Sequence, residues 1–363
     1  MGILKTVDWF LFAPAVFLMV LGGLVLSSVS KNAFPEHFIF LSAALIVFYI
    51  TSKIDVDILF SLSGLLYIFS LLLLISTLIL GFIHPGVVTR GASRWIYLGP
   101  FALQPSEFIK PALLLFFANV VSSRTGFLRF FLALAAFLPA FILVALQPDL
   151  GSAIVLSAGF LGILFFGGLP LRALAGAFVL LTAFLPFAWQ FLANYQKLRI
   201  LTFLYPTADP LGAGYNSLQA MIAVGSGGLF GRGLGQGTQS QLSFLPERHT
   251  DFIFAALSEE LGFAAATLAL AAFFIILYRL IIILRKQENV LLQSLLGGIF
   301  FVFFIHIAVN VGMNMGVLPI TGIPLPFVSS GGSSLLTMSA MLGMAAGISS
   351  RLKTGSRTDI ILM

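Results

Sequence analysis

A series of nearly uncharged apolar segments, each about 20 residues long, limits the fold of this chain more than any other feature. The first of them, residues 9–28, reads WFLFAPAVFLMVLGGLVLSS and contains no charged side chain. An apolar helix of about 20 residues is long enough to cross a bilayer. The whole chain is 59% hydrophobic and 9% charged, whereas a soluble domain is about 25% charged. Alternating barrel-type strands are absent from the sequence, so we predict that the segments cross a membrane as helices.

We therefore predict an all-α integral membrane protein, a bundle of about ten transmembrane helices in one polytopic domain, residues 1–363. The longest connection, residues 191–250, is predicted to be an extracytoplasmic loop between the seventh and eighth spans. The spans are predicted at residues 9–28, 36–52, 58–82, 104–122, 127–146, 150–167, 171–190, 251–283, 290–314 and 328–349.

The basic residues predict the orientation of the bundle. Cytoplasmic loops carry an excess of Lys and Arg, and an even number of spans places both termini on one side. The side with the termini has short loops that are more basic and carry no motifs, so we predict that the N- and C-termini are cytoplasmic. That side carries Lys5, Lys53, Arg124, Arg129, Arg172, Arg279, Arg285, Lys286, Arg351, Lys353 and Arg357, and the other side carries Lys31, Arg90, Arg94, Lys197, Arg199, Arg232 and Arg248.

The composition excludes several kinds of site. The chain has no cysteine, which rules out disulfides, a thiolate nucleophile and cysteine metal ligands. No G-x-x-x-x-G-K-[ST] motif occurs, and the glycines of GSGGLFGRGLGQG (225–237) lack the spacing of a dinucleotide site. We interpret that segment as a flexible or tightly turned loop. The net charge of +6 fits basic cytoplasmic loops, and binding to nucleic acid is not expected.

The predicted outer loops contain nearly all the motif-like sequence, and LPERHTDFIFAALSEE (245–260) is the most unusual part. Glu247, His249 and Asp251 crowd one turn just before a long apolar run. Asp251 can be an ordinary first-turn residue of a helix that Thr250 caps. A carboxylate at the membrane boundary is also partly desolvated, which makes it a better proton acceptor. We therefore favour Asp251 as a catalytic base, with Glu247 and His249 beside it as candidates for substrate binding.

Further polar residues are candidates for substrate binding. Glu107 and Lys110 have i, i+3 spacing, which places them on one helix face. A charged pair inside a span is by default a functional site, and the alternative is a packing clasp between helices. Asp149 follows a proline at a predicted helix start, where capping is the favoured interpretation. Three outer cations either stay solvated or together hold an anionic diphosphate: Arg94, Lys197 and Arg199.

Other ionisable residues are predicted to be structural. Glu259 and Glu260 lie about two turns, or ~12 Å, inside a span. Pairing with a basic residue is the favoured interpretation for them. His84 and His306 stand alone beside apolar neighbours. No close helical spacing of His and carboxylates predicts a built-in metal site, although a divalent cation can assist a diphosphate leaving group.

Four stretches give the chain a resemblance to a known family: RWIYLGPFALQPSEFIKP, QPDLGSA, GYNSLQAMIAVGSGGLFGRGLGQGTQSQLSFLPERHTDFIFAALSEELGF and LPITGIPLPFVSSGGSS. They resemble the SEDS proteins (shape, elongation, division and sporulation) over about residues 90–334. The sequence of the third stretch and the short terminal segments are more similar to the elongation branch of that family than to the division branch.

The resemblance implies a bacterial peptidoglycan glycosyltransferase that polymerises lipid II on the outer face of the cytoplasmic membrane. It also implies a class B penicillin-binding protein, a transpeptidase, as partner. The essential acid of the family falls on Asp251, and its polar helix motif falls on Glu107 and Lys110. Asp251 would take the proton of an acceptor sugar hydroxyl while a polyprenyl diphosphate leaves the growing strand. Because diphosphate leaves as a stable anion, one base and nearby cations should suffice.

Two other classes of function stay open at the level of the sequence. A charged pair inside a span and broken helices are features of transporters, so the chain could flip the lipid-linked precursor. It could also be a non-catalytic scaffold that holds the transpeptidase. The polar motifs gather on one predicted face, whereas alternating access needs gates on both faces, and this favours the glycosyltransferase.

Overall fold

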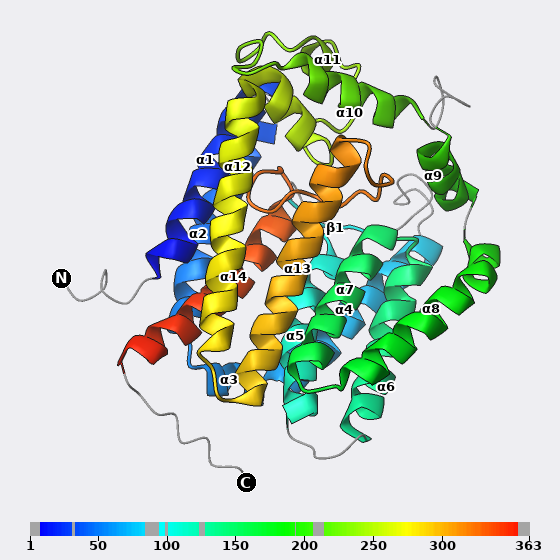
Figure 1. Cartoon of the computed structure of the whole chain (residues 1–363), viewed down its shortest axis with the longest axis vertical. Coiled ribbons are helices and arrows are strands. Elements are labelled where there is room, and N and C mark those ends of the chain that lie inside the picture. The colour runs from blue at the N-terminus through cyan, green and yellow to red at the C-terminus, as the bar shows by residue number, and fades with distance from the viewer. Residues whose placement is uncertain are drawn as a thin grey trace.

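The computed structural model describes residues 8–30, 33–83, 94–98, 101–122, 128–192, 194–205 and 214–354, and these form a helical bundle (Figure 1). His84, which was predicted to be structural, lies outside the described residues. So do five of the basic residues on which the predicted orientation rests: Lys5, Lys31, Arg90, Arg124 and Arg357. The helices are α1 (Trp9–Val29), α2 (Ala33–Lys53), α3 (Val56–Ser61), α4 (Ser63–Ile83), α5 (Pro105–Ser122), α6 (Leu128–Leu146), α7 (Leu150–Phe166), α8 (Leu171–Phe191), α9 (Asn194–Leu204), α10 (Tyr215–Ser226), α11 (Thr238–Gln241), α12 (Ile253–Arg285), α13 (Val290–Asn314) and α14 (Gly332–Thr354).

The prediction of an all-α polytopic membrane protein is confirmed. Among the described residues, seven helices are long and apolar enough to cross a membrane: α1, α2, α4, α6, α12, α13 and α14. The other three predicted spans coincide with α5, α7 and α8. Helix α5 contains the charged Glu107 and Lys110, and α7 is a shorter apolar helix. The predicted number of about ten spans is therefore approximate.

Two predicted span boundaries are wrong. The predicted span at 58–82 is two helices, α3 and α4, separated at Leu62. The last helix begins at Gly332 instead of 328. The connection predicted at 191–250 contains three helices, of which α10 and α11 cover the upper end of the bundle (Figure 1). A short antiparallel hairpin, β1 (Ile96–Leu98) and β2 (Phe101–Leu103), precedes α5.

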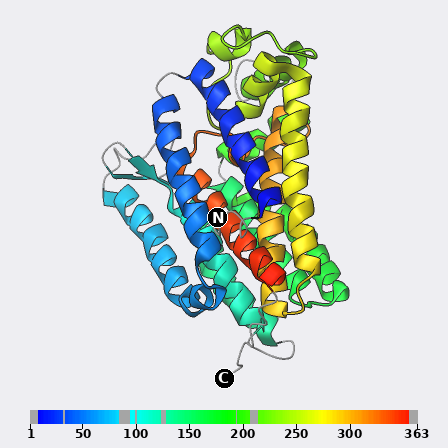
Figure 2. The same cartoon turned by 90° about the vertical axis from the view of Figure 1, so that its left-hand side faces the viewer.

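Glycines let pairs of helices approach closely. Helix α7 packs against α13 where Gly162 faces Gly297, and a Cβ on Gly162 would lie 2.6 Å from the Gly297 carbonyl oxygen. Helix α14 lies beside α2 (Figure 2), where a Cβ on Gly343 would lie 2.5 Å from the Phe48 carbonyl oxygen. Small residues at such crossings stabilise membrane helices, because backbone packing replaces the hydrophobic effect there.

Helix α12 is broken at Gly262, whose φ is 76°. The segment 227–233 lies in the break and replaces the lost helical hydrogen bonds. Phe263 and Ala264 donate their N–H groups to carbonyls of this segment at 2.9 and 3.0 Å. A Cβ on Gly231, whose φ is 80°, would lie 2.1 Å from the Glu260 carbonyl oxygen. The glycine-rich stretch is therefore a tightly turned loop, which is one of the two forms, flexible or tightly turned, that the sequence predicted.

Ion pairs join helix ends at the other end of the bundle. Arg279 of α12 donates to Asp8 at 2.7 Å, and Asp8 is 1% exposed. Arg351 of α14 donates at 2.5 Å to Asp55, the N-cap residue of α3, in an exposed pair. The hydrogen bond from Arg351 is the main cause that holds the pKa of Asp55 below its usual value.

Candidate active site

Asp251 lies in a turn that precedes α12 and not in the helix itself. The helix begins at Ile253, with Phe252 at the N-cap position and no side-chain capping bond. The alternative in which Thr250 caps the helix is therefore wrong, because the Thr250 hydroxyl donates to Glu247 instead, at 3.3 Å. The half-buried Asp251 therefore does not cap α12.

The backbone around Asp251 is held by α13 and by the segment before α14. The carbonyl oxygen of Asp251 accepts hydrogen bonds from Asn310 at 3.0 Å and from Asn314 at 3.1 Å. The preceding carbonyl, of Thr250, accepts from the Ser329 hydroxyl at 2.7 Å. Three bonds within two residues fix the position of this turn.

The predicted pair Glu107 and Lys110 forms a buried ion pair on α5. The Lys110 ammonium donates to a Glu107 carboxylate oxygen at 2.5 Å, and the two side chains are 1% and 2% exposed. The other Glu107 oxygen accepts from the Thr337 hydroxyl of α14 at 3.3 Å. The prediction that they share one helix face is confirmed, and the pair faces the interior of the bundle.

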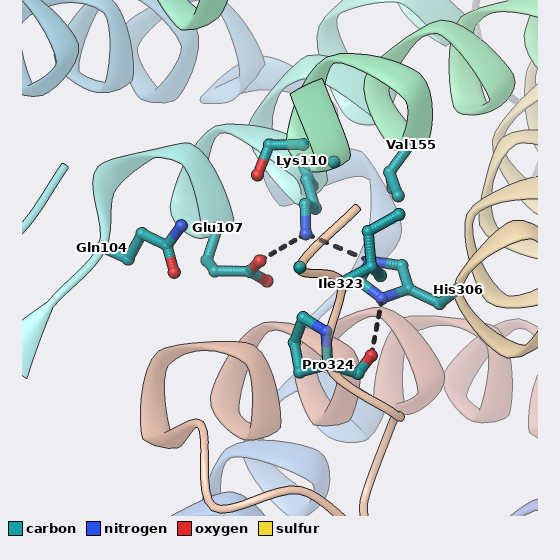
Figure 3. Close-up of a pocket in the computed structure, with 10 residues that line it drawn as sticks. Gln104, Glu107, Lys110, Val155, His306, Ile323 and Pro324 are labelled. Carbon is teal, nitrogen blue, oxygen red and sulfur yellow. Dashed lines mark hydrogen bonds and ion pairs between the residues drawn. The ribbon is translucent and has the colours of Figure 1, made fainter. Parts of the chain in front are cut away.

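His306 of α13 completes this charged cluster (Figure 3). Its Nε2 lies 3.1 Å from the Lys110 ammonium, and its Nδ1 lies 3.2 Å from the Pro324 carbonyl oxygen. An ammonium group can only donate. Nε2 therefore accepts from Lys110, and Nδ1 carries the proton that it donates to Pro324. The sequence placed His306 alone among apolar neighbours, whereas the fold brings it to a buried cation.

A small cavity lies beside this cluster. Its lining includes Lys110, His306 and the backbone of Gly322, and Figure 3 shows the side chains that surround it. Asp251 is next to the same wall, since a Cβ on Gly322 would lie 3.5 Å from Asp251 Oδ2. The free space is about 20 Å³, which is room for about one water. The catalytic candidate and the buried cation thus flank one short segment, residues 321–324.

Asp149 is a helix cap. One carboxylate oxygen accepts from the Ser152 N–H of α7 at 3.1 Å, and the other accepts from Gln104 and Ser106 at 3.2 and 3.1 Å. The capping interpretation is confirmed. Asp149 nevertheless bears on the site, because it holds Gln104 and the first turn of α7, and both line the cavity.

The three outer cations have different neighbours. Arg94 donates to the carbonyls of Gln147 and Pro148, at the junction of α6 and α7. Arg199 of α9 donates to the carbonyl of Ile320 at 3.3 Å, two residues before Gly322. Lys197 is half-buried on the same helix as Arg199. Arg199 is therefore the cation placed next to the 321–324 segment, and a single cluster of all three is not observed.

Glu247 and His249 support the turn that carries Asp251. The Glu247 carbonyl accepts from the N–H groups of Thr250 and Phe252, and its φ is 50°. The His249 carbonyl accepts from the N–H of Ser330 at 3.0 Å. These contacts position the turn, and the substrate-binding role predicted for the two side chains stays a prediction.

Glu259 and Glu260 are fully buried but do not pair with a basic residue in the described part of the chain. Glu259 accepts from the N–H groups of Gln239 and Ser240 at 2.8 and 2.9 Å, at the start of α11. Glu260 accepts from Ser28, from Ser240 and, at 2.7 Å, from the Gln241 side chain. The expected basic partner is absent among the described residues: donors of the 237–241 segment bond to both carboxylates, while one buried oxygen of Glu260, Oε2, has no hydrogen-bond partner.

The sequence analysis did not predict a polar stripe on α13. His306, Asn310 and Asn314 are each 0% exposed and follow one another at four-residue spacing. This spacing places them on one face of the helix, which contacts both Asp251 and the 321–324 segment. The i, i+4, i+8 pattern of polar residues in an apolar helix was the signal that could have found them. Among the described residues, no group of three or more His, Asp or Glu side chains is arranged to hold a metal ion.

The chain is similar to known proteins in both sequence and structure. The sequence profile of a family described as "Cell cycle protein", which joins FtsW, RodA and SpoVE, matches residues 5–354. Peptidoglycan glycosyltransferase MrdB of Escherichia coli K12 is 41% identical over 282 residues, 75% of each chain. A solved structure described as a peptidoglycan synthase complex that coordinates polymerization and crosslinking has a TM-score of 0.82 and 31% identity, over 96% of this chain and 98% of that one. The rod shape determining protein RodA of Thermus thermophilus has a TM-score of 0.70 and 28% identity, over 95% and 97%.

Proposed function

Because the chain belongs to the cell cycle protein family of FtsW, RodA and SpoVE, the SEDS proteins, we propose that it is a peptidoglycan glycosyltransferase. Its substrate is lipid II, which it polymerises into glycan strands at the outer face of the bacterial cytoplasmic membrane. The sequence motifs favour the elongation branch of the family, and this assignment stays a prediction.

One observation carries the proposal. A carboxylate that does not cap α12, Asp251, lies against the same backbone segment as a small cavity lined by the buried pair Glu107 and Lys110. Buried charges inside a membrane are costly and mark functional sites. The bonds from Asn310, Asn314 and Ser329 hold the turn in place, and a catalytic group needs such support.

The proposed step is a glycosyl transfer. The 4-hydroxyl of lipid II attacks the anomeric carbon of the terminal sugar of the growing strand, and a new glycosidic C–O bond forms. The bond between that carbon and the polyprenyl diphosphate breaks, and the diphosphate leaves as an anion. Asp251 takes the proton of the attacking hydroxyl. Nearby cations stabilise the leaving anion, and the position of Arg199 beside the 321–324 segment makes it the first candidate.

The cavity is too small for a sugar in this conformation, since its free space is about 20 Å³, whereas ligand pockets are roughly 300–1,000 Å³. The sugars therefore bind at its mouth, beside Asp251, or after the 321–324 segment moves. A divalent cation bound to the diphosphate stays a prediction.

The orientation and partner belong to the same proposal. We place the end of the bundle with α10 and α11 on the extracytoplasmic side, and both termini in the cytoplasm, which agrees with the positive-inside rule. In this orientation the pair of Arg351 and Asp55 lies at the cytoplasmic end, and Arg248, which donates to the Val29 carbonyl, lies at the outer end. A class B penicillin-binding protein is the proposed partner.

The test is polymerisation of lipid II by the purified protein, with and without its transpeptidase partner. We expect polymer from the wild type and a loss of about 10²–10⁴-fold for Asp251→Asn, because the general base is removed. The matched control is Asp55→Asn, which changes an exposed carboxylate at the opposite end of the bundle and should keep full activity.

The same variants separate the two alternatives. A flippase would move lipid II across sealed vesicles without forming polymer. A scaffold would yield polymer only through another enzyme and would tolerate Asp251→Asn. Either outcome would refute the glycosyltransferase assignment.

A further inference from the structure

The polar stripe His306, Asn310 and Asn314 makes bonds that converge on two segments of the chain. Polar groups buried in a membrane helix are costly unless each has a partner. Here the partners are carbonyl oxygens of Asp251, Ile323 and Pro324, from segments about 70 residues apart in sequence. The stripe therefore joins the turn that precedes α12 to the segment that precedes α14.

Asn310 links the backbone of Asp251 to the backbone of Ile323. Its Nδ2 group has two N–H donors. One donates to the carbonyl of Asp251 at 3.0 Å, and the other donates to the carbonyl of Ile323 at 2.8 Å. Asn314 also donates to Asp251, at 3.1 Å, but its other bonds go to Asn310 and Ala255. The Asn310 amide thus bridges the Asp251 turn and the wall of the cavity.

The link extends to the buried ion pair. Ile323 is followed by Pro324, whose carbonyl accepts from His306, and His306 in turn accepts from Lys110. Gly322, on the other side of Ile323, faces the Asp251 carboxylate. A displacement of the 321–324 segment would therefore alter both the distance of Asp251 from the cavity and the surroundings of Lys110.

We propose that Asn310 is a positioning residue that holds the Asp251 carboxylate in register with the cavity. The proposal rests on the proposed glycosyltransferase function and adds to it a residue that acts through Asp251. Loss of the Asn310 amide should shift the Asp251 turn without unfolding it, because Thr250 stays bonded to Ser329 and His249 to Ser330.

The first experiment compares Asn310→Leu with the wild type in lipid II polymerisation. A displacement of about 1 Å at a catalytic group can cost about 10²-fold. We expect kcat to fall about 10–100-fold with a nearly unchanged KM, and the acid limb of the pH–rate profile to shift. Asn119→Leu is the matched control. Asn119 is also a helical amide, on α5, and it donates to the carbonyl of Phe60 in α3 and to the hydroxyl of Ser63 at the start of α4. It should change neither kcat nor the pH profile.

The second experiment measures the position of residue 251 without catalysis. The chain has no cysteine, so Asp251→Cys provides a single thiol. We expect its alkylation rate with iodoacetamide to change several-fold when Asn310→Leu is added, and to stay constant when Asn119→Leu is added. If Asn310→Leu does not fold, Asn310→Ser replaces it, because serine keeps one donor and should give a smaller change of the same kind.

The two experiments separate the two claims. A wild type that makes no polymer would refute the proposed function, while the thiol experiment would still test the positioning role. If Asn310→Leu keeps wild-type kcat where Asp251→Asn is inactive, or leaves the thiol reactivity unchanged, the positioning role is wrong and the function stands.

Discussion

Removal of the Lys110 charge should destabilise the protein far more than removal of an equally short ion pair at its surface. Lys110 and Glu107 are 2.5 Å apart and 1% and 2% exposed. Lys110→Met leaves the Glu107 carboxylate buried with a single hydroxyl donor, Thr337. Breaking one partner of a buried pair costs about 3–5 kcal/mol, because the remaining charge is desolvated and uncompensated.

The matched control is Arg351→Met. Arg351 and Asp55 are also 2.5 Å apart, but the side chains are 27% and 52% exposed. Water solvates the charges of an exposed pair in both states, so such a pair contributes about 0.2–1 kcal/mol. The two ion pairs have the same distance but different burial, so burial should decide how much unfolding free energy each variant loses.

The measurement is the free energy of unfolding in detergent micelles, together with lipid II polymerisation. We expect the double variant Glu107→Gln/Lys110→Met to recover most of the stability, because both charges are then absent. Its activity should stay low if the pair serves the reaction. Recovery of activity together with stability would show that the pair is only a packing clasp. A cost for Lys110→Met no larger than that for Arg351→Met would refute the reasoning from burial.

Two further predictions concern packing and pH. Gly162→Ala should destabilise the bundle by about 1–3 kcal/mol, because the new methyl group would lie 2.6 Å from the Gly297 carbonyl oxygen. Gly176→Ala on α8 is the control and should be neutral or stabilising, because a Cβ there has nothing within 4 Å. Equal unfolding free energies for the two variants would contradict this prediction. The Asp55 pair should stabilise the fold above about pH 4, because the pKa of Asp55 is lowered in the folded state, and this contribution should vanish as the pH falls through that lower pKa. The difference in unfolding free energy between wild type and Arg351→Met, about 1 kcal/mol or less, should disappear in acid; a difference that persists or grows would show that another group is responsible.

The fold was largely predictable because the length of an apolar run is a local property of the sequence. The runs at 9–28 and 290–314 became α1 and α13 with nearly the same bounds. The break at Gly262 was not predictable, since it depends on a segment about 30 residues earlier that supplies its hydrogen bonds. The helices α9, α10 and α11 lie in a less apolar connection, where length and hydropathy give no signal.

The site was predictable in part for the same reason. The spacing of Glu107 and Lys110 is local, and their contact was expected. The partners of Glu259 and Glu260 come from the distant 237–241 segment, so the sequence suggested an ionic partner where the fold supplies amides and hydroxyls. His306 was expected to be structural because its neighbours in sequence are apolar, yet its neighbour in space is Lys110.

The central claim is that Asp251 acts as the base in glycosyl transfer, and the pH dependence of polymerisation at saturating lipid II tests it most directly. The wild-type rate should fall on the acidic side with the protonation of one group. In Asp251→Asn, the residual rate, about 10²–10⁴-fold lower, should have lost that acidic limb. A residual rate that keeps the same acidic limb, or an undiminished rate, would contradict the assignment.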